Sequence, residues 1–303
     1  IPAQPSDGKT AGGQPAAKAE KTEEVEPLPK EDMKDLQAEL DSYIGLATVK
    51  EEVRNLINMA SVYKLRRQHD LPTTDMSLHM VFTGNPGTGK TMMARMMARI
   101  YRSLDILSKG QLVEVDRSGL VAGYVGQTAI KTQKVIQKAI GGVLFIDEAY
   151  ALNGKSENDF GQEAIDTILK AMEDHRDDLV VIVAGYTDLM DRFIHSNPGL
   201  ESRFNRFLLF EDYTPDEMLD IFKMQCKKGC YQLSDGVEEL VRDYITEENG
   251  DPETFGNARG VRNIFEHILV AQNNRLAAME TVTKEDLMTL TQDDVLHARG
   301  KLD

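Results

Sequence analysis

Cysteine is scarce and tryptophan is absent in this chain of 303 residues. Its two cysteines, Cys226 and Cys230, have no second pair with which to form a zinc site, and its six histidines show no spacing typical of metal ligands. These shortages exclude a disulfide-stapled secreted domain and give no indication of a structural metal. They are typical of a protein kept in a reducing compartment, and we expect a cytoplasmic location.

Long apolar runs are also missing, because no stretch approaches the roughly 18 residues that a membrane-spanning helix needs. Basic residues are in the minority: 35 Lys and Arg stand against 50 Asp and Glu, which gives a net charge of −15. Proteins that bind the nucleic-acid backbone usually present a basic face, so this balance argues against a nucleic-acid partner. A local basic channel on an acidic protein stays compatible with the same net charge.

The first 30 residues differ in composition from the rest of the chain. They hold half of its ten prolines and no aromatic residue. Such a segment buries too little apolar surface to offset the entropy of ordering it, so we predict a disordered linker or tail over residues 1–30. The segment serves either as a tether to an upstream domain or as a solvated tail.

After residue 30 the pattern changes to alternating helices and apolar strands. Continuous apolar strands separated by helices predict a parallel sheet covered on both faces, and hence an α/β domain over residues 31–212. Only helical periodicity follows, which predicts a small helical domain over residues 213–303. The predicted strands are 78–82, 112–115, 143–146, 179–184 and 207–210, and the predicted helices are 32–40, 47–68, 90–101, 128–140, 159–175, 215–228, 235–248, 258–278 and 284–290.

The first of these strands leads into a motif that fits the pattern G-x-x-x-x-G-K-[S/T] of a phosphate-binding loop. Its glycines let the backbone curl so that N–H groups point inward at phosphate oxygens. Lys90 reaches the β- and γ-phosphates, the Thr91 hydroxyl ligates Mg²⁺, and the following helix directs its positive end at the phosphates. The predicted site for ATP and Mg²⁺ consists of Gly84, Asn85, Pro86, Gly87, Thr88, Gly89, Lys90 and Thr91.

Two acids, Asp147 and Glu148, follow the apolar strand 143–146. Parallel strands end at the same sheet edge, where α/β folds bind ligands, so we expect both acids beside the phosphate loop. Asp147 then holds Mg²⁺, directly or through water, and Glu148 polarises the water that attacks the γ-phosphate. These residues predict Mg-dependent hydrolysis of ATP.

Several further motifs carry a family resemblance. Together with the phosphate loop, the segments Ile44-Gly45, Tyr124–Thr128, Gly141–Tyr150, Gly161–Ala164 and Val183–Tyr186 resemble the CbxX/CfqX family of AAA+ ATPases. That family includes the red-type Rubisco activases and the stage V sporulation protein K group. The resemblance covers roughly residues 31–295, and it implies an AAA+ P-loop NTPase domain with a parallel sheet, followed by a small all-helical lid domain.

The resemblance also assigns roles to single residues. Arg203 matches the arginine finger, which reaches the γ-phosphate held by a neighbouring subunit and is worth about 10³–10⁵ in rate. Arg259 matches the sensor-2 arginine of the lid, and Arg262 lies one helical turn further on as a weaker candidate. Ile44 and Gly45 fall among the nucleotide-binding residues of the family.

Tyr124, Val125 and Gly126 match the triplet that lines the central pore of AAA+ rings and grips a polypeptide. An aromatic ring gives sequence-tolerant apolar contact, and glycines let such a loop move with nucleotide state. The chain departs from many AAA+ proteins after the strand 179–184, where Tyr186 and Thr187 replace the usual polar sensor. Either side chain could orient water, or no direct equivalent exists.

These features together predict an ATP-driven motor that forms a homo-oligomeric ring, a hexamer by resemblance, and engages a client protein through pore loops. One alternative is a Rubisco activase in particular, and another is a motor of the sporulation-protein or secretion-associated type with an unknown client. A third, from a different class, is a clamp-loader-like switch that positions a partner without threading it. The net charge counts against DNA as that partner, and the triplet at Tyr124 counts against a pure switch.

Overall fold

A five-stranded parallel sheet forms the centre of the computed structural model, which describes residues 25–73, 77–124, 126–154 and 159–300. The strand order is β2-β3-β4-β1-β5, and because every neighbouring pair is parallel, all five strands end at the same edge. The predicted strands are confirmed, with ends that shift by one or two residues. The strands are β1 (Met80–Thr83), β2 (Leu112–Val115), β3 (Val143–Ile146), β4 (Val180–Gly185) and β5 (Phe207–Leu209).

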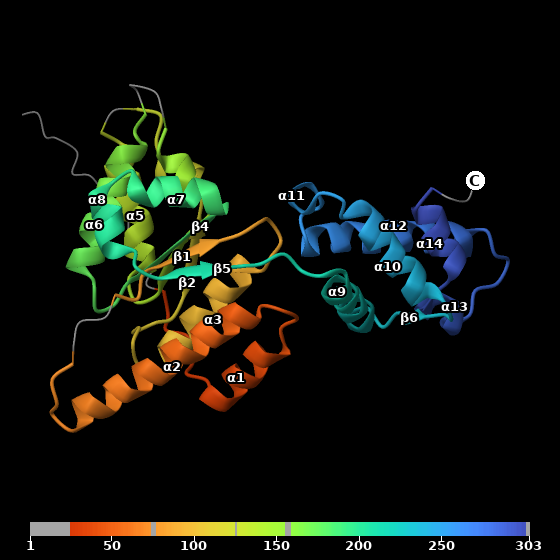
Figure 1. The fold of residues 1–303 in the computed structure, drawn as a ribbon, viewed down its shortest axis with the longest axis horizontal. Coiled ribbons are helices and arrows are strands. Elements are labelled where there is room, and N and C mark those ends of the chain that lie inside the picture. The colour runs from red at the N-terminus through yellow and green to blue at the C-terminus, as the bar shows by residue number, and fades with distance from the viewer. Residues whose placement is uncertain (1–24, 74–76, 125, 155–158, 301–303) are drawn as a thin grey trace, which may run out of the picture.

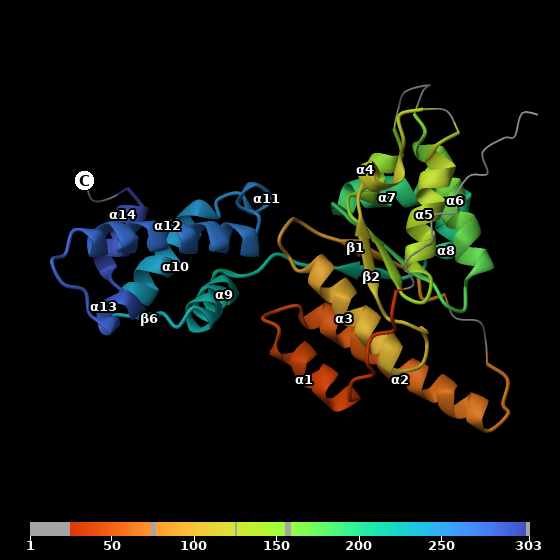
Figure 2. The same cartoon turned by 180° about the vertical axis from the view of Figure 1, so that it is seen from behind.

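Helices cover both faces of the sheet, as its continuous apolar strands require (Figures 1 and 2). Successive strand residues enter opposite cores: Phe82 and Phe145 pack on one side, and Val81 and Leu144 pack on the other. The first core is closed by α1 (Met33–Ser42), α2 (Ala47–Gln68) and α3 (Lys90–Ser103). The second is closed by α4 (Arg117–Leu120), α5 (Thr128–Ala139), the 3₁₀ turn η1 (Ala149–Leu152), α6 (Gly161–Asp174), α7 (Thr187–His195) and α8 (Pro198–Arg203).

The methionines of α3 pack mainly in the core. Met93, Met96 and Met97 are at most 1% exposed, whereas Met92 is 39% exposed. An unbranched thioether side chain fills irregular gaps between helix and sheet, which suits a helix whose start is fixed by the loop before it. The helix directly after the phosphate loop is therefore anchored by its first two turns.

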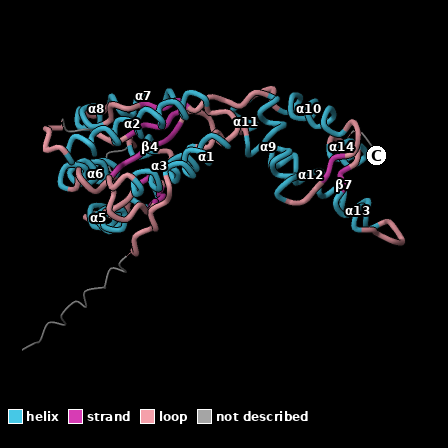
Figure 3. The backbone as a smooth tube through the Cα atoms, turned by 90° about the horizontal axis from the view of Figure 1, so that it is seen from below, coloured by secondary structure: helices cyan, strands magenta, loops and turns pink. Residues whose placement is uncertain are grey.

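A smaller helical domain follows β5 and lies beside the sheet domain, joined to it by one connecting segment (Figure 3). Its core includes Phe222, Val241, Ile264 and Ile268. The predicted helical domain is confirmed, except that the helix predicted over residues 284–290 ends at Met288. Thr289–Leu290 instead pair in parallel with Gln232–Leu233, and these two-residue strands are too short to give a periodic signal. Its elements are α9 (Pro215–Lys228), β6 (Gln232–Leu233), α10 (Val237–Glu248), α11 (Pro252–Phe255), α12 (Ala258–Ala277), α13 (Lys284–Met288), β7 (Thr289–Leu290) and α14 (Gln292–Ala298).

The prediction of a disordered tail over residues 1–30 does not hold for residues 25–30. The backbone N–H of Leu28 donates to the carbonyl of Lys109 over 2.8 Å, and Arg102 Nε donates to the Leu28 carbonyl over 3.0 Å. Lys30 pairs with Asp105 just beyond α3. These contacts make residues 25–30 part of the sheet domain, and residues 1–24 lie outside the described part of the chain.

Candidate nucleotide site

Three neighbouring strands, β3, β4 and β1, end beside one cavity of about 330 Å³. Because β4 lies between the other two strands, the segments that follow all three strands are brought together at one place. The sheet domain supplies Gly84, Pro86, Gly87, Gly89, Lys90, Thr91 and Met92 after β1, Asp147 and Glu148 after β3, and Gly185 and Tyr186 at the end of β4. The lid supplies Ala258, Arg259 and Arg262.

The phosphate loop has the backbone shape that its glycines predict. Gly84 and Gly87 have φ values of 140° and 74°, in the region that favours glycine. A Cβ atom at Gly84 would lie 2.2 Å from the carbonyl oxygen of Phe210, and one at Gly87 would lie 2.1 Å from that of Gly256. These two glycines are therefore required both by the turn and by close packing against the end of β5 and against the lid.

Lys90 begins α3 and bends back over the loop. Its Nζ donates to the carbonyls of Gly84 and Asn85 over 2.8 and 2.7 Å. Burial lowers the pKa of the Lys90 ammonium to about 8, although nearby Asp147 raises it. A partly desolvated cation at a helix N-terminus is a strong attractor for phosphate.

Two residues of the predicted phosphate site do not line the cavity. The buried Thr88 donates its hydroxyl to the carbonyl of Asn85 over 2.8 Å. The Asn85 side-chain amide donates to both carboxylate oxygens of Asp212, over 2.9 and 3.1 Å. Both side chains therefore stabilise the shape of the loop. Contact of Asn85 and Thr88 with phosphate stays a prediction, and it would be made by their backbone N–H groups.

Asp147 and Glu148 adopt a conformation that aims them at the cavity. The backbone N–H of Asp147 extends the β2–β3 pairing by donating to the carbonyl of Val115 over 2.8 Å. Glu148 then has a φ of 49°, which is uncommon for a residue with a side chain and costs about 1–3 kcal/mol. The surrounding structure therefore holds Glu148 in a costly conformation at the edge of the cavity.

The oxygen donors in the cavity fit Mg²⁺. Thr91 offers a hydroxyl and Asp147 a carboxylate, and Mg²⁺ is usually bound by one or two protein oxygens together with substrate phosphates. Within the described residues no group of three or more His, Cys, Asp or Glu side chains could hold a metal ion alone. The ion would therefore bind here together with the nucleotide.

Asn257 joins the lid to the phosphate loop, a role that the sequence did not indicate. Its side chain is buried and donates to Asp212 over 2.8 Å and to the carbonyl of Pro86 over 3.3 Å, while it accepts the backbone N–H of Tyr213 over 2.9 Å. The next residue, Ala258, donates its N–H to the carbonyl of Gly87 over 3.3 Å. One buried amide thus contacts the loop, the connecting segment and the start of α12, which carries Arg259.

Tyr186, rather than Thr187, lines the cavity. Its ring lies 6.3 Å from that of Tyr150, and the pKa of its hydroxyl is raised by burial and by the charges of Glu253 and Glu148. A neutral hydroxyl between Glu148 and the lid is suited to hydrogen bonding with water or phosphate. Thr187 instead starts α7.

Arg203 lies at the other edge of the sheet. It ends α8, and three residues later the carbonyl oxygen of Arg206 accepts the N–H of Val81, near the start of β1, over 2.8 Å. The phosphate loop begins only after Thr83, and a strand rises by about 3.3 Å per residue. The structure therefore separates Arg203 from the cavity of its own chain by the length of the strands.

Family models match both domains. The model of the ATPase family associated with various cellular activities (AAA) matches residues 80–212, and the AAA lid domain matches residues 214–302. A chloroplastic ribulose bisphosphate carboxylase/oxygenase (Rubisco) activase from Cyanidioschyzon merolae is 46% identical over 268 residues, which are 88% of this chain and 90% of that protein. The chain is an AAA+ ATPase of the CbxX/CfqX family.

Other relatives of this AAA+ ATPase carry different names. Protein CbxX (chromosomal) of Cupriavidus necator is 43% identical, over 91% of this chain and 88% of that protein. Stage V sporulation protein K of Bacillus subtilis is 40% identical, over 87% of this chain and 82% of that protein. The family and the ATP-hydrolysing activity are thereby shown, as the sequence motifs predicted.

Solved structures agree on the fold of the ATPase. The AAA domain of FIGL-1 superposes with a TM-score of 0.59 at 18% identity, covering 86% of this chain and 81% of that one. A RuvB mutant of Thermotoga maritima superposes with a TM-score of 0.58 at 19% identity, covering 87% and 72%. At this identity the likeness establishes the α/β domain with its helical lid, and nothing further.

Ile44 and Gly45, which the family resemblance places near the nucleotide, lie against the lid. Ile44 packs on the lid core, and a Cβ atom at Gly45 would lie 2.7 Å from a carboxylate oxygen of Glu217 and 3.1 Å from the ring of Tyr213. Neither residue lines the cavity beside the phosphate loop. Their contact with nucleotide stays a prediction, and their packing shows a role in seating the lid.

The predicted pore loop is exposed. Tyr124 is 74% exposed between α4 and α5, and no atom lies within 4 Å of where a Cβ would be at Gly126. Val125, the middle residue of the triplet, lies outside the described residues. The described part of the loop has the exposure that a contact with another polypeptide needs.

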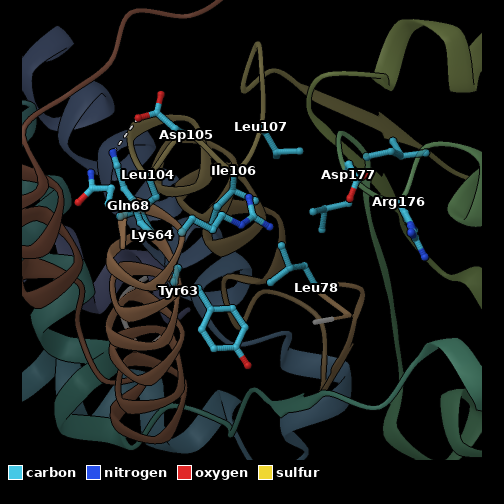
Figure 4. A pocket seen from close by; sticks show the side chains of 14 residues that line it. Tyr63, Lys64, Gln68, Leu78, Leu104, Asp105, Ile106, Leu107, Arg176 and Asp177 are labelled. Atoms are coloured by element: carbon cyan, nitrogen blue, oxygen red, sulfur yellow. Dashed lines mark hydrogen bonds and ion pairs between the residues drawn. The ribbon is translucent and has the colours of Figure 1, made fainter. Parts of the chain in front are cut away.

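A second cavity, of about 560 Å³, lies between the end of α2 and the starts of β1 and β4 (Figure 4). Its labelled residues include Tyr63, Lys64, Leu78 and Asp105, and Lys64 is paired with Asp105 over 2.8 Å. It contains none of the predicted phosphate or acid residues. Although it is larger than the cavity at the strand ends, its position and lining exclude it as the phosphate site.

Proposed function

We propose that this AAA+ ATPase hydrolyses Mg·ATP at the interface between subunits of a homo-oligomeric ring and uses the reaction to remodel a client protein. The supporting observation is the separation of two half-sites: Glu148 lies at the carboxyl edge of the sheet and Arg203 at its amino edge. An arginine finger that cannot reach the cavity of its own chain has to serve the cavity of another. Such a contact joins two different surfaces, the Arg203 edge of one subunit and the cavity edge of the next. When it is repeated around a rotation axis that closes, it forms a ring.

Within the cavity, each role follows from the chemistry of the side chain. Thr91 and Asp147 would hold Mg²⁺, and the ion would neutralise part of the phosphate charge. Lys90 contacts the β- and γ-phosphates, and Glu148 accepts the proton of the attacking water. Tyr186 hydrogen-bonds that water or the γ-phosphate, because it projects from the strand between the other two groups.

The lid reports the state of the nucleotide. Arg259 projects into the cavity from the first turn of α12, and Asn257 fixes that turn to the phosphate loop. When the γ-phosphate is lost, Arg259 loses its partner, and the start of α12 can shift relative to the loop. Such a shift is the step that converts hydrolysis into movement between subunits.

Tyr124 supplies the contact with the client, which we propose to be an extended polypeptide held in the centre of a six-membered ring. An exposed aromatic residue on a glycine-flanked loop gives apolar contact that tolerates many sequences. The relatives are named as a Rubisco activase and as a sporulation protein at similar identity, so Rubisco is one client class among others. No described helix has the length and apolarity to cross a bilayer, and a cytoplasmic location stays a prediction.

The test is the ATPase rate per subunit as a function of protein concentration, for the wild type and for Arg203→Ala, with oligomer size measured in the same samples. We expect the wild-type rate to rise as the oligomer assembles. Arg203→Ala should lose about 10³–10⁵ in rate, because charge that develops in the transition state is no longer stabilised. Its affinity for ATP should be preserved.

Arg192→Ala is the matched control, since Arg192 is an exposed arginine on α7 of the same domain. It should keep the wild-type rate and assembly. A rate that is independent of concentration and unaffected by Arg203→Ala would show a monomeric ATPase or switch, and the ring would have to be abandoned together with the pore loop.

A further inference from the structure

The last turn of α6 has an unfavourable charge pattern. It carries the acids Glu173 and Asp174 and no basic residue, although the C-terminal end of a helix is its negative end. The Glu173 side chain is 71% exposed, so packing in the protein interior does not account for an acid at this position. An acid that weakens the helix it belongs to has to be explained by what it contacts.

Glu173 contacts the guanidinium of Arg203. Its Oε2 accepts from Arg203 Nη2 over 2.7 Å, and Nη1 on the other branch donates more weakly to the carbonyl of Gly199 over 3.3 Å. The Arg203 side chain is 29% exposed. A guanidinium has five N–H groups, so most of its donors stay available while one end is held.

The backbone beneath Arg203 is fixed as well. Ser77 donates its hydroxyl to the Arg203 carbonyl over 2.9 Å, and the buried ring of Phe204 packs edge-on against His79 at 6.2 Å. With the main chain held by the start of β1, the remaining freedom belongs to the Arg203 side chain. Glu173 is the described group that restricts that freedom with a charge-assisted bond.

We propose that Glu173 is a positioning residue for the arginine finger. Its carboxylate holds one end of the Arg203 guanidinium, so that the free N–H groups face the neighbouring subunit's γ-phosphate before that subunit docks. This inference rests on the proposed action of Arg203 on another subunit. Its advantage is entropic: an arginine fixed in advance gives up less rotamer freedom when the transition state forms.

The test compares Glu173→Ala, Glu173→Asp, Arg203→Ala and the double variant at protein concentrations where the wild-type oligomer is fully assembled. Glu173→Ala should lower kcat by roughly three- to thirtyfold, with the KM for ATP and the oligomer size unchanged, because only the positioning of the finger is lost. Glu173→Asp should recover part of the rate. In the Arg203→Ala background, the loss of Glu173 should have no further effect.

Asp174→Asn is the matched control, because it removes the same charge from the same helix turn beside the Glu173–Arg203 pair. It should leave kcat unchanged. The proposal is overturned if Asp174→Asn lowers kcat as much as Glu173→Ala, if Glu173→Ala leaves kcat unchanged or raises it, or if the two losses add in the double variant.

Different results would contradict the proposed role of Arg203 and the proposed role of Glu173. If Arg203→Ala itself keeps the wild-type rate, the finger assignment is wrong and the proposed function falls with it. If Arg203→Ala loses about 10³ or more in rate while Glu173→Ala loses nothing, the finger stands and only the role of Glu173 is wrong.

Discussion

The carboxyl edge of the central sheet and its amino edge contrast sharply in how complete they are. At the carboxyl edge, residues of the phosphate loop, Asp147, Glu148 and the lid residue Arg259 line one cavity within a single chain. At the amino edge, Arg203 is held in place by Glu173 and Ser77, with no phosphate-binding group beside it among its described contacts. The carboxyl edge holds the candidate nucleotide site, and the amino edge holds the residue that we propose acts at the site of a neighbouring subunit.

This contrast shows how a fold makes activity depend on assembly. Binding needs only one chain, because all its groups follow strands that end together. In the proposed ring, fast hydrolysis needs two chains, because β1 and β5 are parallel and Arg203, which precedes β5, lies at the far end of the strands from the loop after β1. If Arg203 is the arginine finger, the parallel topology prevents a lone subunit from using its own finger at its own cavity.

The largest expected effect comes from placing a substitution at each edge of the sheet on a different chain. Lys90→Ala removes the phosphate contact and Arg203→Ala removes the finger, so each variant alone should lose about 10³ or more in ATPase rate. Mixed in equal amounts and allowed to assemble, they should recover activity, since an intact cavity then meets an intact finger at about a quarter of the interfaces of a ring. The measurement is the ATPase rate of the mixture against the two separate samples.

A mixture of Lys90→Ala with the double variant Lys90→Ala/Arg203→Ala provides the control, because no intact cavity is present in it. It should stay inactive. Failure of the first mixture to recover, in samples shown to form mixed oligomers, would mean that both residues act within one chain, against the geometry of the sheet.

The sequence predicted the carboxyl edge well for a physical reason. Strands such as Val143–Ile146 are buried on both faces, so each is an unbroken apolar run that is visible without any partner. The conformation of the phosphate loop likewise depends on local glycines. Asp147 and Glu148 could be placed beside that loop from topology alone, since parallel strands share one edge.

The contacts that the sequence did not reveal are between residues far apart along the chain. Asn257 and Asp212 each look like ordinary polar residues, and only the fold shows that the buried Asn257 amide contacts Asp212, Tyr213 and Pro86. The side-chain contacts at the variable positions of the loop motif also could not be foreseen. Asn85 and Thr88 belong to the motif, but their side chains bond to protein groups because the phosphate is cradled by backbone N–H groups.

The next effect concerns the stability of the amino edge in acid. His79 is buried at the start of β1 and accepts the N–H of Val181 at Nδ1 over 3.0 Å; burial, and then the charge of Arg203, lower its pKa to about 4. As the pH falls, His79 is protonated near pH 6.5 in the unfolded chain but only near pH 4 in the folded chain. Stability is therefore complete above about pH 6.5 and falls as the pH drops toward 4, by about 3 kcal/mol from this residue.

His79→Asn isolates this effect, because an amide oxygen can accept the same N–H and does not titrate. The difference in the free energy of unfolding between wild type and variant, from chemical denaturation at pH 7 and pH 4.5, should shift in favour of the variant as the pH falls. An equal loss of stability in both proteins would assign the acid sensitivity to the carboxylates instead.

The smallest of these effects is an alkaline loss at the carboxyl edge. Burial lowers the pKa of Lys90 to about 8, and phosphate binding favours its charged form. As the pH rises through 8 the free protein loses this charge, so the affinity for ATP should fall by about tenfold between pH 7 and pH 9. Lys90→Arg, whose guanidinium stays charged throughout, should bind with an affinity that is nearly independent of pH. Titration of a fluorescent ATP analogue measures both affinities as a function of pH, and a flat wild-type curve would mean that Lys90 keeps its proton despite its burial.

The two pH effects therefore report on opposite edges of the sheet. Acid lowers the stability of the segment before β1, beneath Arg203, and alkali lowers the affinity of the phosphate loop for ATP.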